Sequence, residues 1–347
     1  MKARRKQNLP LKKPRKKKLS KLPRGHKREE TMKERRSFQT MWSKYGTIGI
    51  FCILLLILMI LRPSAIFNPS SIPQILAQSS VNILLAVGEF FAILIAGIDL
   101  SIGSIAAFTG FVVAKLMIME VPIVLAVFLG ILIATLLGAM NGFLVNKTGL
   151  HPFIITLGTQ TIFRGITLIG TNARSVFGFS GAFSSFMSAR IFVIPVTAII
   201  ALLVAGFFWY FTTRLKVGRN IYAVGGNKEA AWYSGINVSL HTLIVFIISG
   251  FCAGVAGIVL LGRVGAAEPA AASGFETYAI AAAIIGGTSF FGGKGKIPGV
   301  VVGGLIIGLI NYAMTVMTVP SSYQQIVMGS LIIISVTLDR IIGTKKA

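Results

Sequence analysis

The chain has 347 residues, of which 54% are hydrophobic, and its mean hydropathy is +0.80. This composition excludes an ordinary soluble globular protein, because such proteins are less apolar at this length. Several apolar runs are long enough to cross a bilayer as helices. The two cysteines, Cys52 and Cys252, lie within apolar runs, so we expect both to be small buried residues with no disulfide or metal role.

The net charge of +24 is concentrated at the N-terminus, where residues 1–36 carry 17 of the 34 Lys and Arg residues and 3 Glu. Residues 1–40 have no apolar periodicity and are predicted to form a disordered basic cytoplasmic tail. Positive charge before a first span holds it on the cytoplasmic side of a membrane. Binding of nucleic acid or anionic lipid by the tail is an alternative. Met32 and Met41 offer later starts, so the tail is expected to be dispensable.

The remaining chain, residues 41–347, is predicted to be an all-α transmembrane bundle with broken helices. About ten membrane segments are expected, at residues 45–61, 80–96, 105–119, 123–145, 153–170, 191–211, 243–261, 278–286, 300–316 and 325–338. Residues 64–73 are predicted to be an outer loop in which Pro69 and Pro73 break helices. A cytoplasmic N-terminus places Lys147, Lys294, Lys296 and the basic 214–228 interval on the cytoplasmic side, as the positive-inside rule requires.

The polar interval 212–240 separates two strongly apolar runs and is predicted to contain a short exposed helix. Asn227 can cap its N-terminus, and Glu229 falls in its first turn, where a negative charge suits the helix dipole. Ala230 and Ala231 keep the helix slim, and Gly235 can end it in a left-handed conformation. Such a helix suits insertion into a groove on another protein.

Two glycine-rich breaks interrupt apolar runs, and both are predicted to be helix breaks or hinges. The first reads GIDLSIGS and contains Gly97, Asp99, Ser101 and Gly103. A helix break in hydrocarbon frees backbone groups that need partners, so we expect Asp99 or Ser101 to satisfy amides near Gly103. Asp99 is also a functional candidate, because a membrane-buried carboxylate is costly. The second break reads IIGGTSFFGGKGK and contains three candidate hinge residues, Gly287, Gly292 and Gly293.

Several polar side chains lie within apolar runs and are candidates for a sugar path, although helix-to-helix hydrogen bonding is the commoner role. These residues are Asn82, Glu89, Asn141, Gln160 and Asn311. Arg164, four residues after Gln160, can pair with a carboxylate such as Glu89 or Asp99, and the sequence does not choose between them.

The sequence offers little support for catalysis or for nucleotide binding. The GGKG segment does not match a phosphate-binding loop, because Lys294 is followed by Gly295 and position 288 is Thr instead of Gly. No metal site is expected, since the three histidines lack a neighbouring Cys or acidic cluster. No nucleophile–base arrangement is visible, so the chain is not expected to be an enzyme.

The run GGNKEAAWYSGINV resembles the EAA loop of ABC importer permeases, and GIDLSIGS is similar to a hallmark of the ribose/xylose/arabinose-type sugar permeases. The segment GEFFAIL resembles the allose-type members of that family. The resemblance covers about residue 43 to the C-terminus and implies the permease subunit of a bacterial importer for a monosaccharide such as allose or ribose, in the cell membrane.

In this family the EAA loop docks on a separate ATPase. The resemblance therefore implies that Asn227, Glu229, Ala230, Ala231 and Gly235 contact an ATPase, which binds the ATP and Mg. It also implies an extracytoplasmic sugar-binding protein, a permease homodimer and no nucleic-acid partner. An ion-coupled secondary sugar transporter is the alternative, because Glu89 and Asp99 can serve as coupling sites, although such a transporter needs no EAA-like loop.

Overall fold

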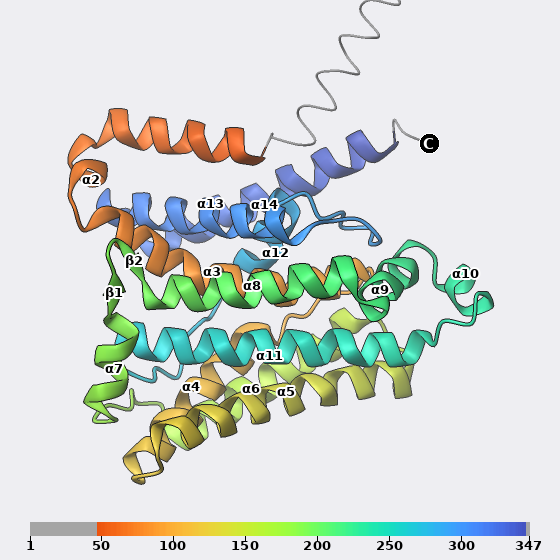
Figure 1. Cartoon of the computed structure of the whole chain (residues 1–347), viewed down its shortest axis with the longest axis horizontal. Helices are drawn as coiled ribbons and strands as arrows, with labels where there is room; N and C mark the ends of the chain where they lie inside the picture. Colours follow the sequence, from red (N-terminus) through yellow and green to blue (C-terminus); the bar gives the residue numbers. More distant parts are fainter. Residues whose placement is uncertain (1–46, 345–347) are drawn as a thin grey trace, which may run out of the picture. The chain divides into compact units, whose positions relative to one another are not determined.

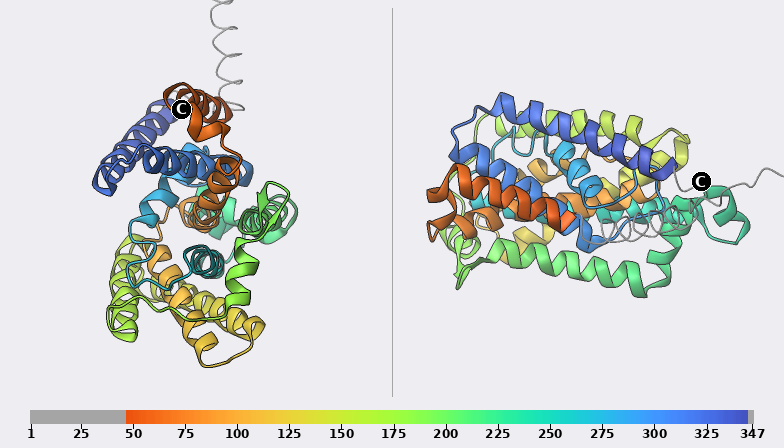
Figure 2. Two further views of the ribbon diagram at one scale, coloured as in Figure 1. Left: turned by 90° about the vertical axis from the view of Figure 1, so that its left-hand side faces the viewer. Right: turned by 90° about the horizontal axis from the view of Figure 1, so that it is seen from above.

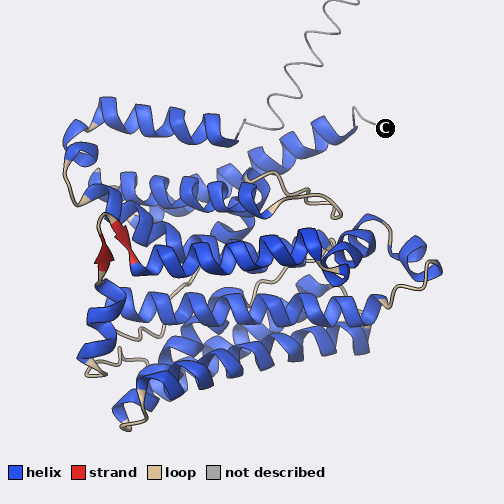
Figure 3. Cartoon of the chain, in the orientation of Figure 1, coloured by secondary structure: helices blue, strands red, loops and turns tan. Residues whose placement is uncertain are grey.

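A computed structural model describes residues 47–344 of the chain, so the predicted basic tail at residues 1–40 lies outside the described residues. Within that range the chain is almost entirely helical (Figure 3). One antiparallel pair joins β1 (Arg190–Ile191) to β2 (Ile194–Pro195). The first helix spans Thr47–Leu61. The helices that follow are α2 (Pro63–Phe67), α3 (Ser71–Leu94), α4 (Ile102–Ile118), α5 (Ile123–Thr148), α6 (Pro152–Thr171), α7 (Gly181–Ser188), α8 (Val196–Arg214), α9 (Lys216–Gly226), α10 (Lys228–Tyr233), α11 (Val238–Val264), α12 (Phe275–Ile285), α13 (Ile297–Val316) and α14 (Ser321–Thr344).

Among residues 47–344, six helices are long and apolar enough to cross a membrane, which confirms a helical membrane protein in outline. They are α3, α5, α6, α8, α11 and α13. Four further apolar helices are shorter: Thr47–Leu61, α4, α12 and the Ser322–Ile334 part of α14. Each of the ten expected segments overlaps one of these helices, but the number of complete crossings stays a prediction.

The helices α3 and α11 form the centre of the bundle (Figures 1 and 2). In the most apolar 18-residue stretch of α3, 83% of the residues are buried, and in that of α11 the share is 78%. The same share is 22% for α5 and 22% for α6. The side chains Phe90, Phe91 and Phe246 are fully enclosed in this core. The peripheral helices therefore have large apolar faces that suit lipid, whereas the two central helices are surrounded by protein.

Glycines allow the central helices to approach their neighbours closely. A Cβ on Gly250 of α11 would overlap the carbonyl oxygen of Ala134 on α5 and lie 2.9 Å from the Cα of Gly138. Small residues at such crossings are the usual means of packing helices in membranes, where van der Waals contact is a major attraction. This packing holds α5 and α11 together beside the break after α3, which both helices contact.

Two expectations about local structure are wrong. Residues 64–73 are not a loop, because they contain most of α2 and the start of α3. Pro73 falls in the first turn of α3, where a helix needs no backbone N–H donor, so proline does not break it there. Cys252 is buried as expected, but Cys52 is exposed on the outer face of its helix. The neighbouring Ile53 is also exposed, which indicates that this face is covered by lipid in a membrane.

Candidate functional site

The break between α3 and α4, residues 95–101, has a buried polar centre at Asp99 and Ser101, and its polar backbone groups are held by side chains. The Asp99 amide donates to Glu89 Oε1 of α3 at 3.2 Å. Thr156 of α6 accepts from the Leu100 amide at 3.1 Å and donates to the Ile98 carbonyl at 3.0 Å. These bonds replace those that the interrupted helix loses, which is the condition for irregular backbone at membrane depth.

Asp99 is the centre of this hydrogen-bond network and is 0% exposed. Its Oδ1 accepts from the amide of Ser101 at 3.0 Å and from the Ser101 hydroxyl at 2.6 Å. Its Oδ2 accepts from the hydroxyl of Ser249, on α11, at 2.6 Å. Asn141 of α5 donates to the Ser101 hydroxyl oxygen at 2.8 Å. Asp99 thus joins the break to α11 directly and to α5 through Ser101.

The expected cap at the start of α4 is only partly correct. Asp99 satisfies an amide, but that amide belongs to Ser101, two residues on, and no side chain caps α4. Asp99 therefore closes a turn before the helix, because an Asp side chain readily bonds the backbone two residues ahead. The suggested pairing of Arg164 with Glu89 or Asp99 is wrong, since its guanidinium bonds two backbone carbonyls elsewhere.

The second interruption in the apolar part of the bundle is residues 265–274, a non-helical segment between α11 and α12. Arg164 Nη1, from α6, donates to the carbonyl oxygens of Pro269 at 2.9 Å and Ala271 at 2.7 Å. At the start of α12, Glu276 Oε1 accepts from Gln160 Nε2 at 3.0 Å. We call the side chains of Gln160, Arg164 and Glu276, with the carbonyls of Pro269 and Ala271, the polar seam.

Gly103 brings the start of α4 against this seam. A Cβ at Gly103 would lie 2.6 Å from the Ala272 carbonyl oxygen and 2.7 Å from Glu276 Oε2. Glycine is therefore required at 103 for close approach, in addition to any hinge role. Neither Glu276 nor this approach was predicted from the sequence. The available signal was a carboxylate in the first turn of an otherwise apolar segment, FETYAIAAAII.

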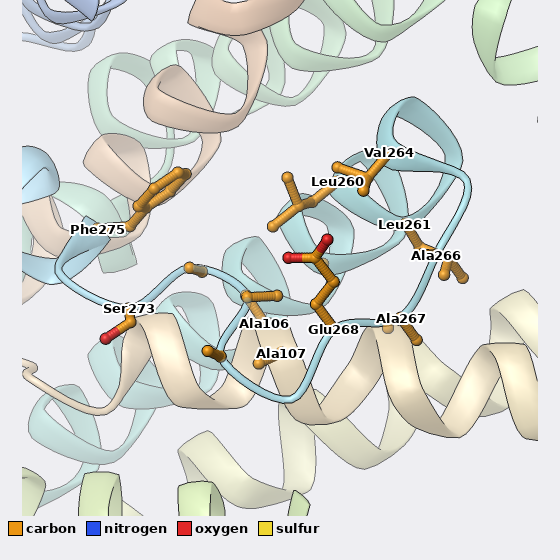
Figure 4. Close-up of a pocket in the computed structure, with 15 residues that line it drawn as sticks. Ala106, Ala107, Leu260, Leu261, Val264, Ala266, Ala267, Glu268, Ser273 and Phe275 are labelled. Atoms are coloured by element: carbon orange, nitrogen blue, oxygen red, sulfur yellow. The ribbon is translucent and has the colours of Figure 1, made fainter. Parts of the chain in front are cut away.

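A cavity of about 240 Å³ lies between α4, α11 and the 265–274 segment (Figure 4). Its floor is made of small residues, including Ala106, Ala107 and Gly257. Figure 4 shows the carboxylate of Glu268 among the lining side chains, directed toward Leu260. The cavity and the polar seam share the 265–274 segment as a common wall.

The glycine-rich loop between α12 and α13 contacts the end of α3. Gly287, Gly292 and Gly293 all have left-handed backbone, with φ of +89°, +86° and +68°. The Gly293 amide donates to the Leu94 carbonyl at 2.8 Å. A Cβ at Gly225, on α9, would overlap the same carbonyl oxygen.

The ends of α3 and α9 and this glycine-rich loop therefore meet backbone to backbone, and we call this contact the glycine junction. Tyr222 of α9 supports it by donating to the Gly295 carbonyl at 2.9 Å. Burial raises the pKa of the Tyr222 hydroxyl, so it stays a neutral donor.

The short helix α10 projects from the bundle beyond the ends of α8 and α11 (Figure 1). Asn227 Oδ1 accepts from the Ala230 amide at 2.9 Å, so the predicted N-cap is confirmed. Gly235 follows the helix with φ of +78°, as its predicted left-handed role requires. Trp232 and Tyr233 are 64% and 81% exposed. Glu229 is exposed in the first turn, Ala230 is also exposed, and Ala231 faces the bundle.

The five side chains predicted for a sugar path fall in two different environments. Gln160 is half-buried in the polar seam, and the other four, Asn82, Glu89, Asn141 and Asn311, are almost entirely buried. Glu89 and Asn141 belong to the Asp99 network, which does not include Gln160. Contact between any of the five and a sugar stays a prediction.

A bundle of apolar helices with two internal interruptions and a projecting short helix is the architecture of a multi-pass membrane permease. Residues 71–336 match the model of a family described as branched-chain amino acid transport system / permease component. The chain belongs to this permease family. No solved structure matches the chain.

Several characterised permeases are similar to the chain over nearly their whole length. The D-allose transport system permease protein of Escherichia coli (strain K12) is 56% identical over 318 residues, covering 91% of this chain and 98% of that protein. The ribose import permease protein of Haemophilus influenzae is 42% identical, covering 85% and 92%. The galactose/methyl galactoside import permease protein of Salmonella typhimurium is 33% identical, covering 90% and 98%. These similarities support the importer permease hypothesis over the ion-coupled one.

Proposed function

We propose that this chain is the membrane permease subunit of an ATP-driven importer for a monosaccharide, and that D-allose is its substrate. The single observation that carries the sugar assignment is the 56% identity to the D-allose permease over 98% of that protein. The similarity to the ribose permease is lower, at 42%. The sugar is taken up by alternating access between two copies of the chain.

The proposed orientation places α10 in the cytoplasm. Basic residues gather on the loops and helix ends nearest α10, as the positive-inside rule expects of a cytoplasmic face. They are Lys147, Arg214, Lys216, Arg219, Lys228, Lys294 and Lys296. An extracytoplasmic sugar-binding protein then delivers sugar at the opposite end, near α7.

In this proposal, α10 inserts into a separate ATPase, which binds ATP and Mg, and the chain itself needs no cofactor. Asn227 shapes the start of the helix, Glu229, Ala230 and Ala231 form its body, and Gly235 returns the chain to α11. Movement of α10 reaches the bundle through α9, whose end belongs to the glycine junction. Gly97, Asp99, Ser101 and Gly103 and the glycine-rich loop are the proposed points where helices reorient.

Uptake of labelled D-allose tests the proposal. The chain is expressed with its ATPase and sugar-binding protein in cells that lack other D-allose and D-ribose transporters. D-allose accumulation that requires all three proteins and ATP is the expected result. Accumulation of D-ribose alone would leave the importer function in place and overturn the sugar assignment. Uptake without the ATPase would overturn the importer function itself.

Gly235→Trp tests the docking of α10, and Gly149→Trp is its matched control. Both glycines have left-handed backbone, and a Cβ at either one would meet nothing within 4 Å. Each variant therefore has the same strain of about 1–2 kcal/mol, but Gly149 ends α5, outside the α10 interval. Only Gly235→Trp should lose co-purification with the ATPase. Equal yields of complex from the two variants would contradict docking at this position.

A further inference from the structure

The polar seam lies at the depth where a membrane protein least tolerates polar groups. Gln160 and Arg164 occupy the middle turns of α6, which is one of the six candidate spans. The other side of α6 presents Ile162 and Ile166, which are 56% and 46% exposed. One helix therefore has an apolar face that suits lipid and a polar face at the same depth.

Lipid is a poor neighbour for this polar face. Gln160 and Arg164 are only half-buried by the chain, so each side chain keeps an exposed part for another contact. Charged and amide groups in the middle of a membrane face protein or a water-filled space, because exposure to hydrocarbon is costly. The seam must therefore face an aqueous path, a second copy of the chain, or both.

Within the seam, one acceptor has no partner. Glu276 is 9% exposed, and its Oε1 accepts from Gln160, but its Oε2 has no hydrogen-bond partner among the described residues. That oxygen lies where a Cβ at Gly103 would come within 2.7 Å of it. A buried acceptor without a partner is costly, and such groups in native structures have a reason. In this structure the oxygen is enclosed beside Gly103, so a donor supplied by a ligand reaches it when the helices reorient.

Arg164 holds the rest of the seam in shape. Its two bonds to the Pro269 and Ala271 carbonyls fix the 265–274 segment against α6. Its positive charge also interacts favourably with the carboxylate of Glu276. Arg164 is thus a positioning residue, which leaves Gln160 and Glu276 to meet a ligand.

We infer that the polar seam is the sugar-contact surface inside the membrane, with Glu276 Oε2 accepting from a sugar hydroxyl beside the Gln160 amide. A neutral monosaccharide supplies many hydroxyl donors, and carboxylates and amides are the groups that bind them directionally. The inference rests on the proposed function, because it names where the imported sugar touches this chain.

Cysteine labelling tests whether the seam faces water. In a chain whose Cys52 and Cys252 are replaced by alanine, Gln160→Cys is compared with Ile162→Cys on the same helix. A charged, membrane-impermeant methanethiosulfonate reagent should label position 160 about tenfold faster or more, because charged molecules are excluded from hydrocarbon. D-allose with its binding protein and ATPase should slow labelling at 160 alone. Faster labelling at 162, whose side chain is the more exposed, would overturn the inference.

Glu276→Gln tests the contact itself in the complete transporter. The variant keeps the side-chain shape but removes the charge. A hydrogen bond to a charged group contributes about tenfold or more to a binding constant. The expected result is about a tenfold fall in sugar transported per ATP hydrolysed, with the yield of complex unchanged. An unchanged ratio of sugar transported to ATP hydrolysed would overturn the inference. The proposed function would still be supported if the wild-type transporter takes up sugar. Absence of sugar uptake by the wild-type transporter would instead show that the proposed function has failed.

Discussion

The two interruptions in the apolar part of this permease are built in opposite ways. Residues 95–101 are tied by side chains from α3, α6 and α11, and through Ser101 from α5. Residues 265–274 line a cavity, and one arginine holds them to α6. Both satisfy the requirement that freed backbone groups find partners. In the first, the polar side chains Asp99 and Ser101 are fully buried, whereas the second lines a cavity.

The difference shows that a helix break is not by itself a ligand site. The Asp99 carboxylate already accepts three hydrogen bonds within the chain, so it has little capacity left for a sugar. Glu276 accepts one such bond and keeps an oxygen without a partner among the described residues. The Asp99 carboxylate therefore has the chemistry of an anchor, and the Glu276 carboxylate has the chemistry of a contact. Glu89 Oε2 and Asn141 Oδ1 in the Asp99 network also have no partner among the described residues.

Asp99→Leu is expected to have the largest effect, because it removes the anchor. Ser101 and Ser249 lose the acceptor for three donors, at about 1–3 kcal/mol for each buried donor left without a partner. The amount of folded permease in membranes should fall sharply. It is measured by extracting the membranes in detergent and running gel filtration with fluorescence detection. Asp99→Asn keeps an acceptor oxygen and should retain most folding and uptake. Loss of uptake by a well-folded Asn variant would show that the charge is needed.

Gly225→Ala should reduce uptake and stability nearly as much, because it disrupts the glycine junction. That junction includes the Leu94 carbonyl at the end of α3, directly before the first interruption. A Cβ at Gly225 would overlap the Leu94 carbonyl, whereas a Cβ at the adjacent Gly226 would meet nothing within 4 Å. Gly226→Ala is therefore the matched control and should transport normally. We expect Gly225→Ala to lower both uptake and thermal stability. Equal behaviour of the two variants would mean that α9 moves freely against α3.

Arg164→Met should have an intermediate effect that differs in kind. Losing two charge-assisted bonds costs about 1.5–3 kcal/mol each, but the released segment lies along a cavity and not in the packed core. Uptake should fall about tenfold or more, while most of the protein still folds. Arg164→Lys keeps the charge but loses the planar guanidinium, so its uptake should lie between that of wild type and that of Arg164→Met. A collapse in folding like that of Asp99→Leu would erase the contrast between the two interruptions.

Glu89→Gln should have the smallest effect. The substitution keeps an oxygen that can accept from the Asp99 amide. Uptake should stay within about twofold of wild type, since the hydrogen bond survives with little net change. Uptake assays at several external pH values provide the measurement. A large loss would show that Glu89 acts through its charge and would bring it closer in role to Glu276.

The sequence by itself determined the class of protein and the local structure of its exposed parts. Apolar runs must be helical in a membrane, because each backbone group is then satisfied within its own segment. The cap at Asn227 and the left-handed Gly235 were also predictable, since each depends on residues within about one helical turn. The same locality explains why the breaks at GIDLSIGS and IIGGTSFFGGKGK were predicted, because glycine and polar residues interrupt runs that are otherwise apolar. Residues 265–274 were not among the predicted breaks.

Only the tertiary structure decided what those breaks contact. Arg164 lies four residues from Gln160, yet its partners are carbonyls more than a hundred residues away. Gly103 was predicted only as a hinge residue and Gly225 was not singled out, and only the close approach of Glu276 or Leu94 explains why each must be glycine. Hydrogen-bond partners and close approaches depend on how helices pack, and helix packing joins residues that sequence spacing does not relate.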